Sequence, residues 1–107
     1  MKRPQVEKID WDDGELVEQA GDQGKAVYRI VNKDHLRIRL VEFEPGYEAA
    51  QELEKSHVAL VLDGEVIVEM ADGRRLLFTP SMSYLIEGKL GPHRTFTEMG
   101  AKLFIVD

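Results

Sequence analysis

Short runs of β-branched, leucine and aromatic residues, each closed by turn residues, constrain the fold of this chain more than any other feature. The runs are too short and too closely spaced for long helices, and Gly, Pro, Asn and Asp recur between them. Such a succession predicts a β-sandwich, a jelly roll or a small barrel. The runs are 25–31, 36–43, 57–62, 65–70, 74–79, 83–86, 93–97 and 102–107.

The turns and one candidate helix refine this prediction. Asp63–Gly64 and Asp72–Gly73 are typical of hairpins, because these residue types tolerate the positive φ angles of tight turns. The segment 49–55, AAQELEK, contains good helix formers, but it spans only about two turns and has no continuous apolar stripe. We therefore expect an all-β chain in which 49–55 is the only candidate helix.

Two of the runs show how their side chains are distributed. Residues 36–40, LRIRL, alternate strictly, so the leucines and the isoleucine lie on one face of the strand and Arg37 and Arg39 on the other. Residues 57–62, HVALVL, are apolar at both odd and even positions after the histidine. We expect both faces of this second strand to be covered.

Length, charge and composition limit the class of protein. The 107 residues suffice for one hydrophobic core, and we expect a barrel domain over 14–107 preceded by an arm, 1–13, that Trp11 anchors. The formal net charge of −6 and the lack of a basic run argue against a nucleic-acid partner. There is no cysteine, no signal-peptide pattern and no apolar run of the ~20 residues that cross a bilayer. These features favour a cytoplasmic protein with neither nucleic acid nor membrane as a partner.

The three histidines are the residues most suited to a site. His35 lies in NKDHL, a pattern typical of a hairpin tip, where a histidine is usually solvated. His57 and His93 each open a strand, and strand ends are where the ligands of small barrels are reached. Histidine is also the commonest metal ligand. Both interpretations stay open for His57 and His93: metal ligands, or half-buried imidazoles that are hydrogen-bonded to the protein.

The order of these residues resembles the motifs of the cupin superfamily, which consists of small jelly-roll barrels. The first cupin motif has a Pro-Gly turn, a His-x-His pair, a Glu a few residues later and then a Gly. Anchored on Gly64, its ligand positions fall on Gln51, Leu53 and His57. The second motif ends in a histidine after a turn, which corresponds to His93 in GKLGPHRTFT. The resemblance implies a single-domain jelly roll with a double-stranded β-helix.

A narrower resemblance is to the small single-domain cupins named for a DHCW motif. It is carried by VEFEPGY (41–47), GEVIVEMADGR (64–74) and PHRTFTEMGAKLFIVD (92–107). In that family the loop after PGY carries Asp-His-Trp-Cys, and a His opens the next strand, so the resemblance implies a site of His, Cys, His and His. The corresponding residues in this chain are Gln51, Leu53, His57 and His93.

The substitutions at these positions weaken the implied metal site. Leu has no donor atom, the amide of Gln is a weak ligand, and two imidazoles alone rarely hold Zn, Ni, Fe or Mn. A carboxylate from Glu52 or Glu54, or from Glu48, would complete a two-histidine, one-carboxylate set. Strand alternation nevertheless points residues 52 and 54 outward if 51 and 53 point inward.

Two functions follow as alternatives. The first is a small-ligand-binding or vestigial cupin barrel with a degenerate metal site, in which Gln51, Leu53, His57 and His93 line the pocket and Leu53 favours an uncharged ligand. The second is a metal-dependent oxygenase or isomerase of a small molecule that uses His57, His93 and a nearby carboxylate.

A homodimer is also expected. The segments 57–62 and 102–107 have apolar residues on both faces, and a single barrel covers only one of them. The resemblance to small cupins implies the same assembly.

Overall fold

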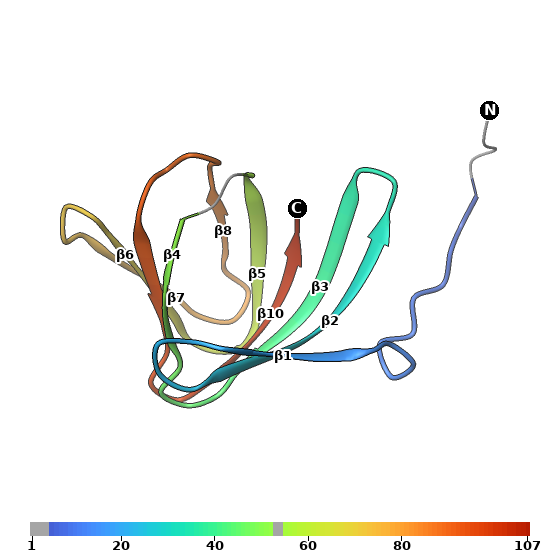
Figure 1. Cartoon of the computed structure of the whole chain (residues 1–107), viewed down its shortest axis with the longest axis horizontal. Coiled ribbons are helices and arrows are strands. Elements are labelled where there is room, and N and C mark those ends of the chain that lie inside the picture. Colours follow the sequence, from blue (N-terminus) through green and yellow to red (C-terminus); the bar gives the residue numbers. More distant parts are fainter. Residues whose placement is uncertain (1–4, 53–54) are drawn as a thin grey trace.

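The computed structural model describes residues 5–52 and 55–107, which form ten β-strands. The strands form two antiparallel sheets, one of six strands in the order β1-β2-β3-β10-β5-β8 and one of four in the order β4-β9-β6-β7. Figure 1 shows how the two sheets curve toward each other around one interior. The expected all-β jelly roll is confirmed. The strands are β1 Leu16–Ala20, β2 Lys25–Lys33, β3 Leu36–Phe43, β4 Glu48–Gln51, β5 His57–Gly64, β6 Val66–Met70, β7 Arg75–Phe78, β8 Ser83–Ile86, β9 His93–Phe96 and β10 Ala101–Val106.

The hydrophobic core lies between the inner faces of the two sheets. Alternate residues of β5 and β10 point into it, which gives β10 a strict alternation of buried and half-buried positions. The most deeply buried large side chains are Val61, Val66, Val68 and Leu103. Burial of this apolar surface is the main force that holds the two sheets together.

The interpretation of residues 49–55 as a candidate helix is wrong. Glu48–Gln51 form β4, which pairs with β9, while residues 53 and 54 lie outside the described part of the chain. Helix propensity is a weak preference, and an unpaired edge of β9 provides backbone hydrogen bonds that override it. The short edge strand β1 is an addition to the predicted strands; its five residues, LVEQA, are largely exposed.

The two Asp-Gly turns have different roles. Asp72–Gly73 closes the β6–β7 hairpin, as predicted. Asp63–Gly64 does not close a hairpin, because β5 belongs to the six-stranded sheet and β6 to the four-stranded sheet. Gly64 has a φ of +77°, and its α-carbon approaches the backbone of Gly100 so closely that no β-carbon fits. The turn signal therefore marks the point where the chain passes from one sheet to the other.

The segment before β1 extends along the barrel and away from it (Figure 1). Trp11 packs edge-on against Phe104 of β10, with the ring centroids 6.5 Å apart. No helix in the described residues is long and apolar enough to cross a membrane.

Candidate functional site

A polar cavity of about 300 Å³ lies inside the barrel, near the end where β3 and β5 begin and β10 ends. Its wall combines core residues with arginine, histidine, tyrosine, glutamine and threonine side chains from both sheets. Of the four residues predicted to line a pocket, Gln51 and His57 line this cavity, His93 is not among its lining residues, and Leu53 lies outside the described residues. The arginines were not predicted. The lining residues are Gln19, Ala26, Tyr28, Arg37, Arg39, Val41, Phe43, Tyr47, Gln51, His57, Tyr84, Thr95 and Ile105.

The arginines reach the cavity because of the alternation along β3. Val41 and Phe43 are buried core residues, so Arg37 and Arg39 lie on the same inward face of this strand. The apolar row that starts at Leu36 consequently faces outward. Sequence analysis recognised the two faces but not their orientation. The sequence does carry a signal for the orientation: Val41 and Phe43 continue the row of alternate residues that contains Arg37 and Arg39, and their apolar side chains favour the core.

A carboxylate neutralises one of the two arginines. The side chain of Asp107 is only 4% exposed and accepts hydrogen bonds from Nε (2.9 Å) and Nη2 of Arg37. This hydrogen bonding, together with the nearby charge of Arg39, keeps the pKa of Asp107 below its ordinary value. Nη2 of Arg39 is 3.5 Å from the same carboxylate, at a side-chain exposure of 18%.

The guanidinium of Arg39 is the less satisfied of the pair. Its Nε is buried and has no hydrogen-bond partner among the described residues. Burial lowers the pKa of Arg39, although a guanidinium keeps its proton in proteins. A buried, charged donor without a partner is energetically costly, and it marks a position that a ligand can satisfy.

His57 opens β5 and is held in its neutral form. Burial, followed by the positive charge of Arg39, lowers its pKa to about 4. Asp107 acts in the opposite direction, while His93 and Arg37 lower the pKa further. The imidazole ring lies 6.3 Å from the ring of Tyr84, whose own pKa burial raises to about 12. At neutral pH both rings are uncharged.

His93 opens β9 and has one free nitrogen. Its Nδ1 is 3.0 Å from the carbonyl oxygen of Gly91; a carbonyl only accepts, so Nδ1–H is the donor. In that tautomer Nε2 is the acceptor nitrogen, and this atom is buried without a partner among the described residues. His93 shares the inward row of β9 with Thr95, which lines the cavity.

The other predicted ligands are less available. Gln51 lies opposite His93 across the β4–β9 pair, and its Oε1 accepts a 3.3 Å hydrogen bond from the Thr95 hydroxyl. Glu52 is exposed, whereas Leu53 and Glu54 lie outside the described residues. His35 is exposed in the turn between β2 and β3, as its hairpin-tip pattern predicts.

The described residues do not fit the metal site that the cupin motifs imply. No group of three or more His, Cys, Asp or Glu side chains within 5–52 and 55–107 is arranged to hold a metal ion. The donor set is two imidazoles and an amide oxygen that Thr95 already occupies. A catalytic zinc or iron site requires about three protein ligands.

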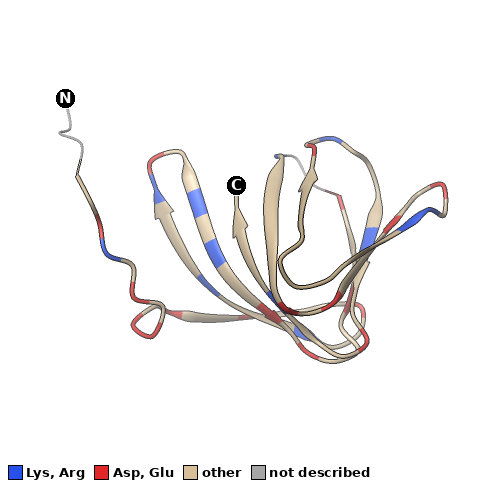
Figure 2. Cartoon of the chain, turned by 180° about the vertical axis from the view of Figure 1, so that it is seen from behind, with Lys and Arg blue, Asp and Glu red and all other residues tan. Residues whose placement is uncertain are grey.

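A second hollow, of about 550 Å³, lies at the other end of the barrel. It is lined by loop residues such as Pro45, Gly64, Glu65 and Gly100, and it is far along the strands from both inward histidines. Figure 2 shows acidic residues in the loops at this lower end and basic residues on β3. Arg39, whose Nε has no partner among the described residues, lines the smaller interior cavity, and His93 neighbours its lining residues Gln51 and Thr95. We therefore take this cavity as the candidate site.

Comparison with solved structures shows that the chain has the cupin fold. An RmlC-like cupin from Shewanella frigidimarina has a TM-score of 0.75 and 19% identity, with 95% of this chain and 89% of that chain covered. Fe(II)-HppE with the alternative substrate (S)-1-HPP has a TM-score of 0.78 and 17% identity, with 95% and 60% covered. A sugar phosphate isomerase of the cupin superfamily from Silicibacter pomeroyi has a TM-score of 0.72 and 18% identity, with 94% and 74% covered. No protein-family model matches the chain, and no curated protein matches its sequence.

Protonation of His57 is expected to destabilise the fold between pH 6.5 and about pH 4. Because the pKa of the folded form is lowered from 6.5 to about 4, the unfolded chain binds this proton first as the pH falls. The stability contributed by the neutral ring is fully present above pH 6.5 and is lost as the pH approaches 4. After allowance for screening by water in the cavity, we expect a loss of roughly 2 kcal/mol.

Urea denaturation between pH 7 and pH 4 measures this effect, with His57→Gln and the exposed-site control His35→Gln in parallel. We expect the pH slope to become shallower in His57→Gln and to stay unchanged in His35→Gln. Equal slopes in wild type and His57→Gln would contradict the assignment of a buried, neutral His57.

Proposed function

We propose that this barrel binds a small organic ligand in its interior cavity and that the binding does not require a metal ion. The observation that carries the proposal is the pair of buried nitrogen atoms without partners, Nε of Arg39 and Nε2 of His93. Buried polar atoms are nearly always hydrogen-bonded in native proteins. Two such atoms at the same end of one barrel favour a site that a ligand completes.

The cavity also has the dimensions and composition of a ligand site. A volume of about 300 Å³ is at the lower end of the range for small-molecule pockets. The wall provides apolar contacts through Val41, Phe43 and Ile105, and hydrogen-bonding groups through Tyr28 and Gln51. A mixed wall of this kind holds a small molecule by burial of apolar area and fixes its orientation by a few polar contacts.

A metal-dependent oxygenase or isomerase is the second candidate. One observation favours it: His57 and His93 are both buried near the same end of the barrel, and His93 is close enough to lower the pKa of His57. The donor count among the described residues argues against it. Elemental analysis of untagged protein for Zn, Ni, Fe and Mn decides between the two candidates. Near-stoichiometric metal that a His57→Ala/His93→Ala variant loses would favour the metal enzyme.

Blocking the cavity is expected to abolish ligand binding. Gln19 lines the cavity from the edge strand β1, so Gln19→Trp should fill the cavity mouth at little cost to the core. Glu18→Trp is the matched control, because the neighbouring residue of a strand points to the opposite face. Saturation-transfer NMR with a library of neutral, anionic and cationic fragments should give hits for wild type and Glu18→Trp and none for Gln19→Trp. The same fragments bound by both variants, or no hit for wild type, would contradict the proposal.

We also propose that two chains associate through the outer face of the six-stranded sheet. Apolar side chains cover this face on neighbouring strands, with Leu85 60% exposed and Val58 48% exposed. Strand pairing places β3, β10, β5 and β8 side by side, so these side chains form one continuous surface. A continuous exposed apolar surface on a single chain is typical of an interface. Its members are Leu36, Ile38, Leu40, Val58, Leu60, Leu62, Leu85 and Val106, while Trp11 covers the neighbouring Phe104.

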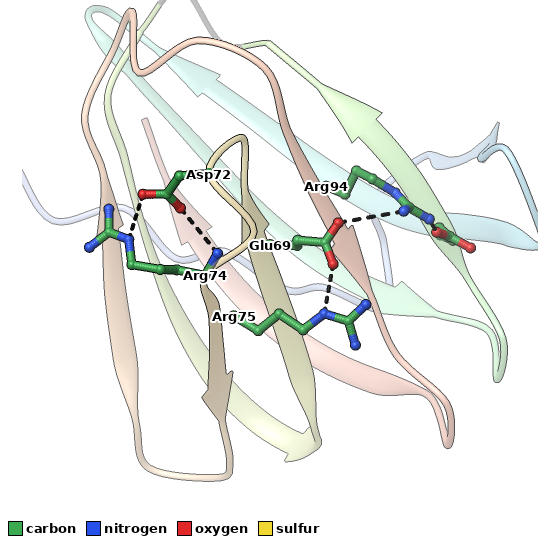
Figure 3. Close-up of polar contacts among 6 residues, drawn as sticks. Glu69, Asp72, Arg74, Arg75 and Arg94 are labelled. Carbon is green, nitrogen blue, oxygen red and sulfur yellow. Dashed lines mark hydrogen bonds and ion pairs between the residues drawn. The ribbon is translucent and has the colours of Figure 1, made fainter.

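The outer face of the other sheet is more polar, although Leu77 of β7 is exposed. Arg94 pairs with Glu48 and with Glu69, and Arg75 donates to Glu69 at 2.6 Å (Figure 3). Exposed ion pairs of this kind contribute little stability but suit a surface in water. The contrast between the two outer faces supports the apolar face as the one that a second chain covers.

A charge placed on the apolar face is expected to separate the two chains. Val58→Glu should convert a dimer to a monomer at micromolar concentration, because an unpaired carboxylate would be buried in the interface. Leu77→Glu is the control, since Leu77 is similarly exposed, at 53%, on β7 of the other sheet. Size-exclusion chromatography with light scattering measures the mass. A monomeric wild type, or a dimeric Val58→Glu, would contradict this interface.

A further inference from the structure

The charges around the cavity do not balance. Arg37 and Arg39 are both cations, and Asp107 is the carboxylate that pairs with them. Among the described residues that line the cavity there is no aspartate or glutamate, and the neutral His57 adds no charge. Among these side chains, two guanidinium groups therefore face a single carboxylate.

The surplus charge belongs to Arg39. Arg37 lies nearer the solvent, with a side chain that is 45% exposed, and two of its nitrogens bind Asp107. Arg39 is the more buried of the two and reaches the same carboxylate only at 3.5 Å. Its Nε–H has no acceptor among the described residues. A guanidinium N–H without an acceptor is suited to a charge-assisted hydrogen bond to a carboxylate oxygen.

His93 provides a second contact, which accepts a hydrogen bond, whereas Arg39 donates one. With Nδ1–H donating to Gly91, the buried Nε2 is an acceptor. A ligand hydroxyl or N–H group satisfies it, whereas a second carboxylate oxygen would not. Arg39 on the cavity wall thus provides a cationic donor, and His93, next to the lining residues Gln51 and Thr95, provides an acceptor at the same end of the barrel.

We propose that the ligand is a small carboxylic acid that also carries a hydroxyl or N–H group, bound as its carboxylate by Arg39 and through that donor group by Nε2 of His93. This inference rests on the proposed ligand-binding function of the cavity and adds the chemical class of the ligand. It replaces the uncharged ligand that Leu53 suggested from the sequence. A single surplus charge favours a monoanion over a phosphate dianion.

Titration of isotopically labelled protein with small probes tests the ligand class. Sodium acetate, sodium lactate, sodium phosphate and acetamide are added at constant ionic strength while the NMR signals of Arg39 Nε–H and the His93 ring are followed. We expect saturable shifts with acetate and lactate, at least about tenfold weaker binding of acetamide, and tighter binding of lactate than of acetate because only lactate has the hydroxyl. Phosphate should bind more weakly than either carboxylate.

Two variants connect these shifts to the residues. Arg39→Met should weaken acetate binding at least about tenfold, and Arg94→Met, on the outer face, should leave it unchanged. In His93→Phe, lactate should lose its advantage over acetate. If Arg39→Met does not fold, Arg39→Lys replaces it, and the acetate-to-acetamide comparison in the wild type decides the ligand class without any variant.

The outcomes separate this inference from the function on which it rests. Acetamide bound as tightly as acetate, or acetate binding unaffected by Arg39→Met, would overturn the carboxylate assignment. If the fragment library gives neutral hits in the cavity while acetate and lactate fail to bind, the assignment is overturned but the ligand-binding function stands. If neither the library nor the probes bind, both are overturned.

Discussion

The alternation of side chains along β3 is the constraint on which the rest of this structure depends. Because successive residues of a strand point to opposite faces, one choice of orientation sends Arg37 and Arg39 into the barrel and Leu36, Ile38 and Leu40 to its surface. Val41 and Phe43 fix that choice, since both belong to the core. The cost is a charged group inside and apolar surface outside, which is the reverse of the usual distribution.

Both proposals follow from this reversed distribution. The interior charge is only partly neutralised by Asp107, so it is suited to an anion that enters from outside the protein. The apolar exterior continues across β10, β5 and β8, so it is suited to a second sheet of the same kind. A protein that binds a ligand commonly retains groups that destabilise its empty form, because the ligand compensates for them.

The sequence predicted most of the fold and part of the site. Alternating apolar runs located eight of the strands, and the strand-opening positions of His57 and His93 were predicted correctly. The sheet crossover at Gly64 and strand β4 were missed, because both depend on pairing partners distant in the chain. The inward arginines were missed for a related reason. LRIRL by itself has two equivalent orientations, and only the packing of Val41 and Phe43 distinguishes them.

The stability of an Arg39→Met variant without ligand tests the central claim most directly. If Arg39 is a buried cation that Asp107 compensates incompletely, an apolar side chain of similar length should raise the free energy of unfolding, by about 1–3 kcal/mol. Asp107 would keep its partner Arg37 in that variant. Urea denaturation at neutral pH, compared with wild type, measures the difference. A gain in stability is the predicted result, and a loss of 1 kcal/mol or more would contradict the account of an unbalanced charge inside the barrel.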